Sequence, residues 1–163
     1  MSAQKIIDDI TKVLLRKKQT VAVAESVTSG NIQAALSLGD NAALFLQGGL
    51  TAYNVVQKCD HLSVNLSDAI ASNCVSELVA SQMAESVCSL FSSSWGIACT
   101  GYATPFPPHT DGGLFACLAI AFNGKVVRKA TIKSVAKTAK NVQLEYTEKV
   151  LGEFLKVIRK GTK

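Results

Sequence analysis

The spacing of apolar positions divides the first quarter of the chain into a helix, a strand and a second helix. Residues 4–17 carry Ile6, Ile10 and Leu14 on one helical stripe and so predict an amphipathic helix. The run TVAVAES at 20–26 is short and apolar without alternation, which is typical of a strand buried on both faces. NIQAALSL at 31–38 has helical character. This order places the intervening turn at the carboxyl edge of a sheet, where functional groups are displayed.

The middle of the chain alternates between further strand and helix patterns. GGLTAYN at 48–54 predicts a second strand, and Ser67 with Asp68 predicts the cap of a short helix. Residues 75–91 predict a longer helix whose inner face carries Val75, Leu78, Val79, Gln82, Met83, Ser86, Val87 and Leu90. WGIACTG at 95–101 predicts another buried strand, and the three prolines that follow it predict a loop.

The last third of the chain predicts a hairpin and a long helix. Two strand-like runs, at 114–122 and 125–134, are separated by Asn123-Gly124, a strong signal for an antiparallel β-hairpin. Apolar residues recur at helical spacing over 138–158. Together the elements predict an α/β three-layer sandwich, with a mixed, mostly parallel sheet, helices on both faces and a C-terminal β-hairpin. The length of 163 residues fits one domain, 1–163.

Composition excludes several classes of protein. No apolar run reaches the roughly 18 residues of a membrane span, and Asp8, Asp9 and Lys12 interrupt the first segment, so we expect no membrane association and a cytoplasmic location. The five cysteines are odd in number and widely spaced, and the chain has only two histidines. We therefore expect free, mostly buried cysteines and no metal site.

The chain is basic, with 17 Lys and Arg against 12 Asp and Glu and a net charge of +5. The surplus lies mainly after position 124 and suits an anionic ligand. A solvated strand face and a basic tail are the simpler interpretation. Aromatic residues do not interleave with the basic ones, so no nucleic-acid partner is predicted.

Three segments in order resemble motifs of one family. VAVAESVTSG at 21–30, GGLTAYNVVQK at 48–58 and CTGYATP at 99–105 are similar to the motifs of the CinA carboxy-terminal family, also known as nicotinamide-nucleotide amidohydrolases. The resemblance implies that Ser26 is a nucleophile, that Lys58 works with it, and that Tyr53 lines the same pocket. It also implies a substrate-binding set drawn from the first and third segments: Glu25, Thr28, Ser29, Gly30, Thr100 and Gly101.

The resemblance further implies an activity and its partners. The family hydrolyses the carboxamide of nicotinamide mononucleotide to nicotinic acid mononucleotide and ammonia, without a cofactor or metal. The expected partner is therefore a small pyridine nucleotide, and the expected assembly is a homo-oligomer, a dimer or larger.

The sequence departs from the family pattern inside the motifs themselves. Ser29 replaces a glycine, Asn54-Val55-Val56-Gln57 replaces a more polar run, and 139–143 lacks the arginines of the family's R-x-x-V-R. Three hypotheses stay open: an amidohydrolase acting through a Ser26 acyl-enzyme, a non-catalytic nucleotide-binding paralogue, and an amidase for another small amide whose pocket is reshaped by the loop from Tyr102 to Gly113.

The proposed chemistry sets physical conditions on these residues. Lys58 acts as a base only if it is desolvated or near other cations, and the apolar Val55 and Val56 are compatible with that. The turn at 27–30 begins a helix whose amino end favours an oxyanion or a phosphate. Tyr53 can relay a proton or hold Lys58 by a hydrogen bond. The alternative interpretation gives Ser26, Thr28 and Glu25 helix-capping roles and makes Lys58 a surface lysine.

Overall fold

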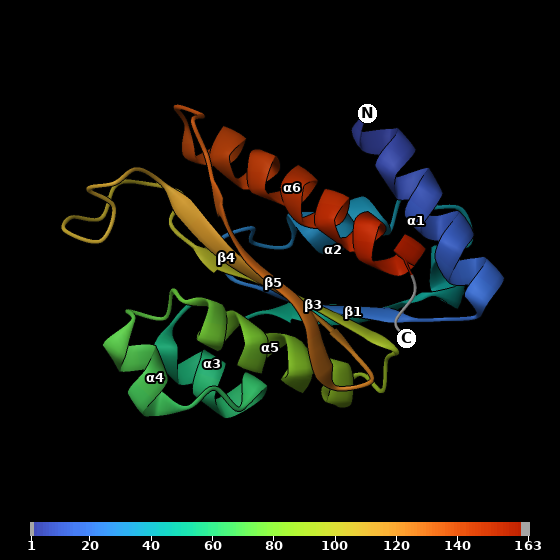
Figure 1. The fold of residues 1–163 in the computed structure, drawn as a ribbon, viewed down its shortest axis with the longest axis horizontal. Helices are drawn as coiled ribbons and strands as arrows, with labels where there is room; N and C mark the ends of the chain where they lie inside the picture. The colour runs from blue at the N-terminus through green and yellow to red at the C-terminus, as the bar shows by residue number, and fades with distance from the viewer. Residues whose placement is uncertain (1, 161–163) are drawn as a thin grey trace.

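The structure is a computed structural model that describes residues 2–160, and within them a five-stranded sheet lies between two layers of helices (Figure 1). The α/β class and the layered arrangement predicted from the sequence are confirmed. In chain order the elements are α1 (Ala3–Lys17), β1 (Val21–Glu25), α2 (Asn31–Leu36), a 3-10 turn (Ala42–Leu44), β2 (Leu46–Thr51), α3 (Val55–Leu62), α4 (Leu66–Ala71), α5 (Glu77–Leu90), β3 (Trp95–Gly101), β4 (Phe115–Phe122), β5 (Lys125–Lys133) and α6 (Ala139–Lys160).

The sheet has a parallel half and an antiparallel half. Its strand order is β2-β1-β3-β4-β5, and β1 pairs in parallel with both β2 and β3. β4 is antiparallel to β3 and to β5. Asn123 and Gly124 connect β4 to β5 with positive φ angles of 49° and 75°, the backbone that a tight hairpin turn requires. The carboxyl ends of the three parallel strands therefore meet at one edge of the sheet, where the turn after β1 lies.

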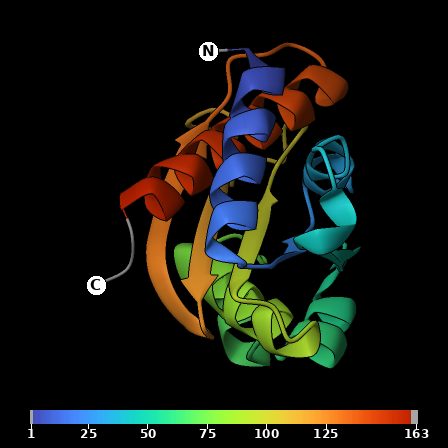
Figure 2. The ribbon, with the colours of Figure 1, turned by 90° about the vertical axis from the view of Figure 1, so that its right-hand side faces the viewer.

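The two faces of the sheet bury side chains of different size. Alternate residues of β1 point to opposite faces, so that Val21 and Val23 join the core under α1, α2 and α6, whereas Ala22 and Ala24 join the core under α3, α4 and α5. Figures 1 and 2 show these two helical layers on either side of the sheet. The small residues bring α5 close: a Cβ at Gly96 would lie 2.1 Å from the carbonyl oxygen of Ala84.

Three features of the second helical layer differ from the sequence prediction. Helix α3 was not predicted, because it is only eight residues long and half of its residues are polar. The cap of α4 is Asn65, whose side chain accepts hydrogen bonds from the backbone of Ser67 and Asp68. In α5, Leu78 and Leu90 are 51% and 55% exposed, because alanines and Cys88 share the buried stripe with Val79, Met83 and Val87.

Other sequence predictions concern the cysteines and the membrane. Cys88, Cys99 and Cys117 are buried, Cys59 and Cys74 are half-buried, and all five are free thiols. Between residues 2 and 160 no helix combines the length and the apolar character needed to cross a bilayer.

Candidate functional site

Ser26 and Lys58 lie in contact at the carboxyl edge of the parallel strands. The Lys58 amine donates a hydrogen bond of 2.9 Å to Ser26 Oγ and one of 3.0 Å to the carbonyl oxygen of Ala52. Ser26 directly follows β1 and Lys58 belongs to α3, so the contact joins segments 32 residues apart. Lys58 is only 1% exposed, although a lone lysine in a sequence usually indicates the surface.

The direction in which Lys58 points is set by the start of α3. The Asn54 side chain caps this helix by accepting a hydrogen bond from the backbone N–H of Gln57. With that start, Lys58 and Leu62, one turn apart, are the buried positions of α3. Val55 lines the site, but Val56 is 55% exposed and takes no part in desolvating the amine, contrary to the sequence expectation.

Burial shifts the protonation equilibrium of the lysine. Desolvation lowers the pKa of Lys58 below its ordinary value of 10.5, and a thiolate at Cys74 would act weakly in the opposite direction. A buried ammonium loses its hydration, whereas a neutral amine loses little, so the environment favours the form that can accept a proton. The condition that the sequence set for a lysine base is thus met by the geometry of the site.

Glu25 lies beneath the turn and not in the pocket. Its carboxylate is fully buried and accepts hydrogen bonds from the backbone N–H groups of Gly30, Ile32 and Gln33 at 2.9–3.1 Å, and from the Gln33 side chain at 3.2 Å. The carboxylate therefore occupies the amino end of α2. Three N–H groups at this helix end are bound to an internal carboxylate and cannot receive a phosphate, so an oxyanion beside Ser26 can be met only by N–H groups earlier in the turn.

The rest of the turn provides backbone and not side chains. Ser29 and Gly30 have positive φ angles of 53° and 93°, and neither lines the pocket. The Thr28 hydroxyl is buried without a hydrogen-bond partner, also outside the pocket lining. The backbone N–H groups of Val27 and Thr28 have no acceptor among residues 2–160 and directly follow Ser26. They are the nearest donors along the chain to a charge that develops beside this serine.

A pocket of about 470 Å³ opens over the Ser26–Lys58 pair. Of the residues predicted from the third motif, Thr100 and Gly101 both line it. The Thr100 hydroxyl donates to the carbonyl oxygen of Cys74 at 2.8 Å, and a Cβ at Gly101 would lie 2.5 Å from the Cβ of Ala116. Tyr53 also lines the pocket, but it is 66% exposed and makes no hydrogen bond to Lys58, so the predicted link between them is not formed.

Further residues line the pocket beyond the predicted site residues, and of these Asn73, Cys74 and Val75 were not singled out as site residues from the sequence. These further residues come from the α4–α5 connection, from the loop after β3 and from the first turn of α6: Asn73, Cys74, Val75, Tyr102, Ala103, Thr104, Phe106, Ala139 and Gln143. Asn73 donates to the Tyr102 hydroxyl at 3.0 Å. No local pattern distinguishes Asn73, Cys74 and Val75 from ordinary loop residues, whereas Ala139, Gln143 and the loop from Tyr102 were marked by their departure from the family motifs.

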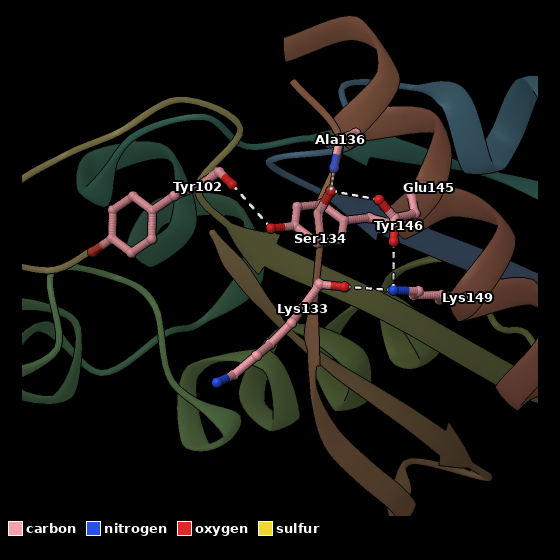
Figure 3. Close-up of polar contacts among 7 residues, drawn as sticks. All are labelled: Tyr102, Lys133, Ser134, Ala136, Glu145, Tyr146 and Lys149. Carbon is pink, nitrogen blue, oxygen red and sulfur yellow. Dashed lines mark hydrogen bonds and ion pairs between the residues drawn. The ribbon is translucent and has the colours of Figure 1, made fainter. Parts of the chain in front are cut away.

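A polar network fixes the wall formed by the loop and α6 (Figure 3). Tyr146 on α6 donates from its hydroxyl to the carbonyl oxygen of Tyr102. Ser134, after β5, donates to Glu145 at 2.6 Å, and Glu145 also pairs with Lys149 at 2.6 Å. These contacts, drawn in Figure 3, hold the first turns of α6 against the end of β5 and beside the pocket.

Fold and site together define an α/β protein with a buried serine–lysine pair at the carboxyl edge of its parallel strands. Residues 3–158 match the CinA C-terminal domain family, and the chain therefore belongs to this family, as the three sequence motifs indicated. A CinA-like protein of Trichodesmium erythraeum is 38% identical over 96 residues, which cover 59% of this chain and 23% of the relative. A putative competence-damage inducible protein of Streptococcus pneumoniae is 31% identical over 121 residues, 73% of this chain and 29% of that protein. The matches thus cover about a quarter of the length of these curated relatives.

Solved structures share the fold over nearly the whole chain. A CinA superfamily protein from Klebsiella pneumoniae aligns with a TM-score of 0.90 and 21% identity, covering 99% of this chain and 100% of that one. A competence or damage-inducible protein from Enterobacter asburiae aligns with a TM-score of 0.88 and 24% identity, covering 97% and 99%. At this level of identity the likeness establishes the architecture alone.

Proposed function

We propose that this protein is an amidohydrolase in which Ser26 is the nucleophile and Lys58 the general base. The observation that carries the proposal is the 2.9 Å contact between a buried amine and a hydroxyl at the floor of a pocket. The substrate named by the family resemblance is nicotinamide mononucleotide, whose carboxamide would yield nicotinic acid mononucleotide and ammonia.

The first half of the reaction forms an acyl-enzyme. Neutral Lys58 accepts the proton of the Ser26 hydroxyl while Ser26 Oγ forms a bond to the carbonyl carbon of the amide. The second hydrogen-bond partner of the amine, the Ala52 carbonyl, holds it in place during this transfer. As the carbon–nitrogen bond breaks, the Lys58 ammonium returns its proton to the departing nitrogen, which leaves as ammonia.

The second half releases the acid. A water molecule attacks the ester, gives a proton to Lys58, and the ester bond to Ser26 Oγ breaks as that oxygen takes the proton back. Both halves pass through a tetrahedral oxyanion, for which the free N–H groups of Val27 and Thr28 are the proposed donors. Removing one such donor typically costs about 3 kcal/mol of transition-state stabilisation, so the backbone of this turn is part of the proposed machinery.

The same observations bear differently on the two alternatives to this proposal, which are a non-catalytic nucleotide-binding paralogue and an amidase for another small amide. A paralogue that only binds nucleotides has no need for a desolvated lysine in contact with a serine, and burial of an amine costs stability. An amidase for another small amide would use the same pair with a different pocket wall. Gln143 and Ala139 line the pocket in place of the family's arginines. This favours an amidase for another small amide over the paralogue that only binds nucleotides.

Ammonia release from nicotinamide mononucleotide by the wild type and by Ser26→Ala tests the function. We expect turnover by the wild type and its loss in the variant, with acid and ammonia formed in equal amounts. Turnover that survives in Ser26→Ala would reject the nucleophile. Turnover absent from the wild type for every pyridine carboxamide tried would reject an amidohydrolase of pyridine carboxamides.

A further inference from the structure

Resting on the amidohydrolase function proposed above, we propose that the preferred substrate is an aromatic primary carboxamide without a phosphate group, so that the mononucleotide is the poorer substrate. Three features of the described residues carry this inference: the chemistry of the pocket lining, the occupied amino end of α2, and a wall of aromatic rings. Each concerns a different part of the site, and all three bear on how a phosphate would be received.

The pocket lining offers a phosphate no permanent cation. Among the described residues that line it, Lys58 is the only basic side chain, and the proposed reaction needs this amine neutral. The remaining polar side chains carry hydroxyl, thiol and amide groups, including those of Thr104 and Gln143. Phosphate recognition generally uses Arg or Lys, because only charge-assisted donors offset the dehydration of a dianion. Neutral hydroxyl and amide groups instead match the hydroxyls of a sugar or a bare ring.

Apart from Lys58, the basic side chains of residues 2–160 lie outside the pocket lining. Lys125, Arg128, Lys129 and Lys133 on β5 are exposed, and none of them lines the pocket. The net positive charge that suggested an anionic ligand thus lies on side chains outside the pocket lining, including Lys137 and Lys140, which flank the pocket-lining Ala139 without lining the pocket themselves. Arg128 is paired with Glu153 at 3.0 Å, which further reduces the field that β5 contributes.

The amino end of α2 is closed to an external anion. The Glu25 carboxylate accepts the N–H groups of Gly30, Ile32 and Gln33 and places a buried negative charge directly beneath the turn that carries Ser26. At the first turn of α6, beside Gln143, Thr138 already accepts the N–H groups of Asn141 and Val142. The donors at the amino end of α2 are thus committed to the protein's own carboxylate, and at α6 the Thr138 side chain takes the N–H group of Asn141.

The pocket wall formed by the loop after β3 suits a flat ring. Tyr102, Phe106 and His109 lie nearly parallel, with centroid separations of 5.7–6.1 Å and interplanar angles of 12–17°. Tyr102 and Phe106 line the pocket, and the stacking holds their ring planes in a common orientation. A planar aromatic carboxamide, including a cationic pyridinium, can lie against such faces while its amide carbon meets Ser26.

The test compares three substrates that differ by one group at a time: nicotinamide mononucleotide, nicotinamide riboside, which lacks only the phosphate, and nicotinamide. We expect kcat/KM for ammonia release to be at least about tenfold higher for the riboside than for the mononucleotide, because a desolvated dianion has no cation to receive it. Equal values, or a preference for the mononucleotide, would overturn the inference and leave the amidohydrolase function standing. A cation supplied by a second copy of the chain would produce that result.

A charge introduced into the pocket supplies an independent readout. In Gln143→Arg we expect the ratio of kcat/KM for mononucleotide over riboside to rise by about tenfold, since a guanidinium would then meet the phosphate. Asn141→Arg is the matched control, because residue 141 is exposed on the opposite side of the same turn of α6 and adds the same charge outside the pocket. A ratio unmoved by Gln143→Arg, or moved equally by both variants, would contradict the inference.

Binding separates the inference from the function on which it rests. If no compound releases ammonia, the thermal shift of the wild type with each of the three decides the question, because a ligand raises Tm according to its concentration over Kd. A larger shift with the riboside than with the mononucleotide would support the phosphate-free class although the catalytic proposal had failed. A larger shift with the mononucleotide, or no shift with any of them, would reject it.

Discussion

The Tyr146 hydroxyl donates a hydrogen bond of 3.1 Å to the carbonyl oxygen of Tyr102, the residue that follows β3. This contact joins segments 44 residues apart and fixes the start of the loop that lines the pocket. Both groups are buried, and burial raises the pKa of Tyr146, so the hydroxyl stays a donor throughout the accessible pH range. The wall of the pocket therefore depends on α6 as well as on the loop itself.

Replacing this hydroxyl should loosen the wall without opening the core. In Tyr146→Phe the ring remains, but the Tyr102 carbonyl loses its partner, and we expect a loss of about 1–2 kcal/mol in the free energy of unfolding. We also expect KM for the amide substrate to rise more than kcat falls, because the loop lines the pocket but supplies neither member of the Ser26–Lys58 pair. Urea unfolding and steady-state kinetics measure both. Tyr53→Phe, at an exposed tyrosine, is the control for stability, and equal stability of the two variants would contradict the argument.

Ser26 and Lys58 should act as one unit in kinetics. Either Ser26→Ala or Lys58→Met is expected to lower kcat by about 10³-fold or more, and the double variant should be scarcely worse than either single one. The reason is that each residue has no catalytic use without its partner. A double variant whose loss equals the product of the two single losses would indicate independent roles. Lys12→Met, at an exposed lysine of α1, controls for the change of charge.

The activity should rise with pH and then level off. Because the base is the neutral amine, kcat/KM should increase with pH up to the pKa of Lys58 and be constant above it. Since burial lowers this pKa, the plateau should begin at a pH below 10.5. Rates measured from roughly pH 6 to pH 10, with a substrate that does not titrate there, would show this limb. A rate that falls over the same range would instead require the ammonium form and reject Lys58 as the base.

The stability of the fold should depend on pH through the same residue. Between the lowered pKa of folded Lys58 and the ordinary value of 10.5, the unfolded chain binds more protons than the folded chain. Stability contributed through this group therefore increases with pH across that window, and it is reduced at lower pH. Wild type should gain stability relative to Lys58→Met as the pH is raised, which chemical denaturation at several pH values would detect. Parallel pH profiles for the two proteins would contradict the burial argument.

Glu25 should be needed for the turn and not for charge in the pocket. Glu25→Gln keeps the shape but replaces one accepting oxygen by a donor that faces backbone N–H groups, so we expect a loss of about 2–3 kcal/mol in the free energy of unfolding. The matched control is Glu148→Gln, at an exposed position of α6, where the change should stay within about 0.5 kcal/mol. A Glu25→Gln protein as stable as the control would show that the carboxylate is not required to organise α2.

The sequence by itself determined the elements whose patterns are long or unambiguous. The buried run of β1 and the hairpin turn at Asn123-Gly124 lie where they were predicted, as does the stripe of α6. It also marked Ser26 at the end of a buried strand. Such features follow from hydrophobic periodicity and turn chemistry, which act between residues close together in the chain.

Only the tertiary structure decided which of these residues meet. Helix α3 is too short and polar to be recognised from its pattern, yet its start at Asn54 turns Lys58 inward to Ser26. The same folding buries Glu25 under α2 and leaves Tyr53 exposed, although both belong to matched motifs. A local pattern fixes the face on which a side chain lies, but its protonation, burial and partners depend on segments that the fold brings from elsewhere in the chain.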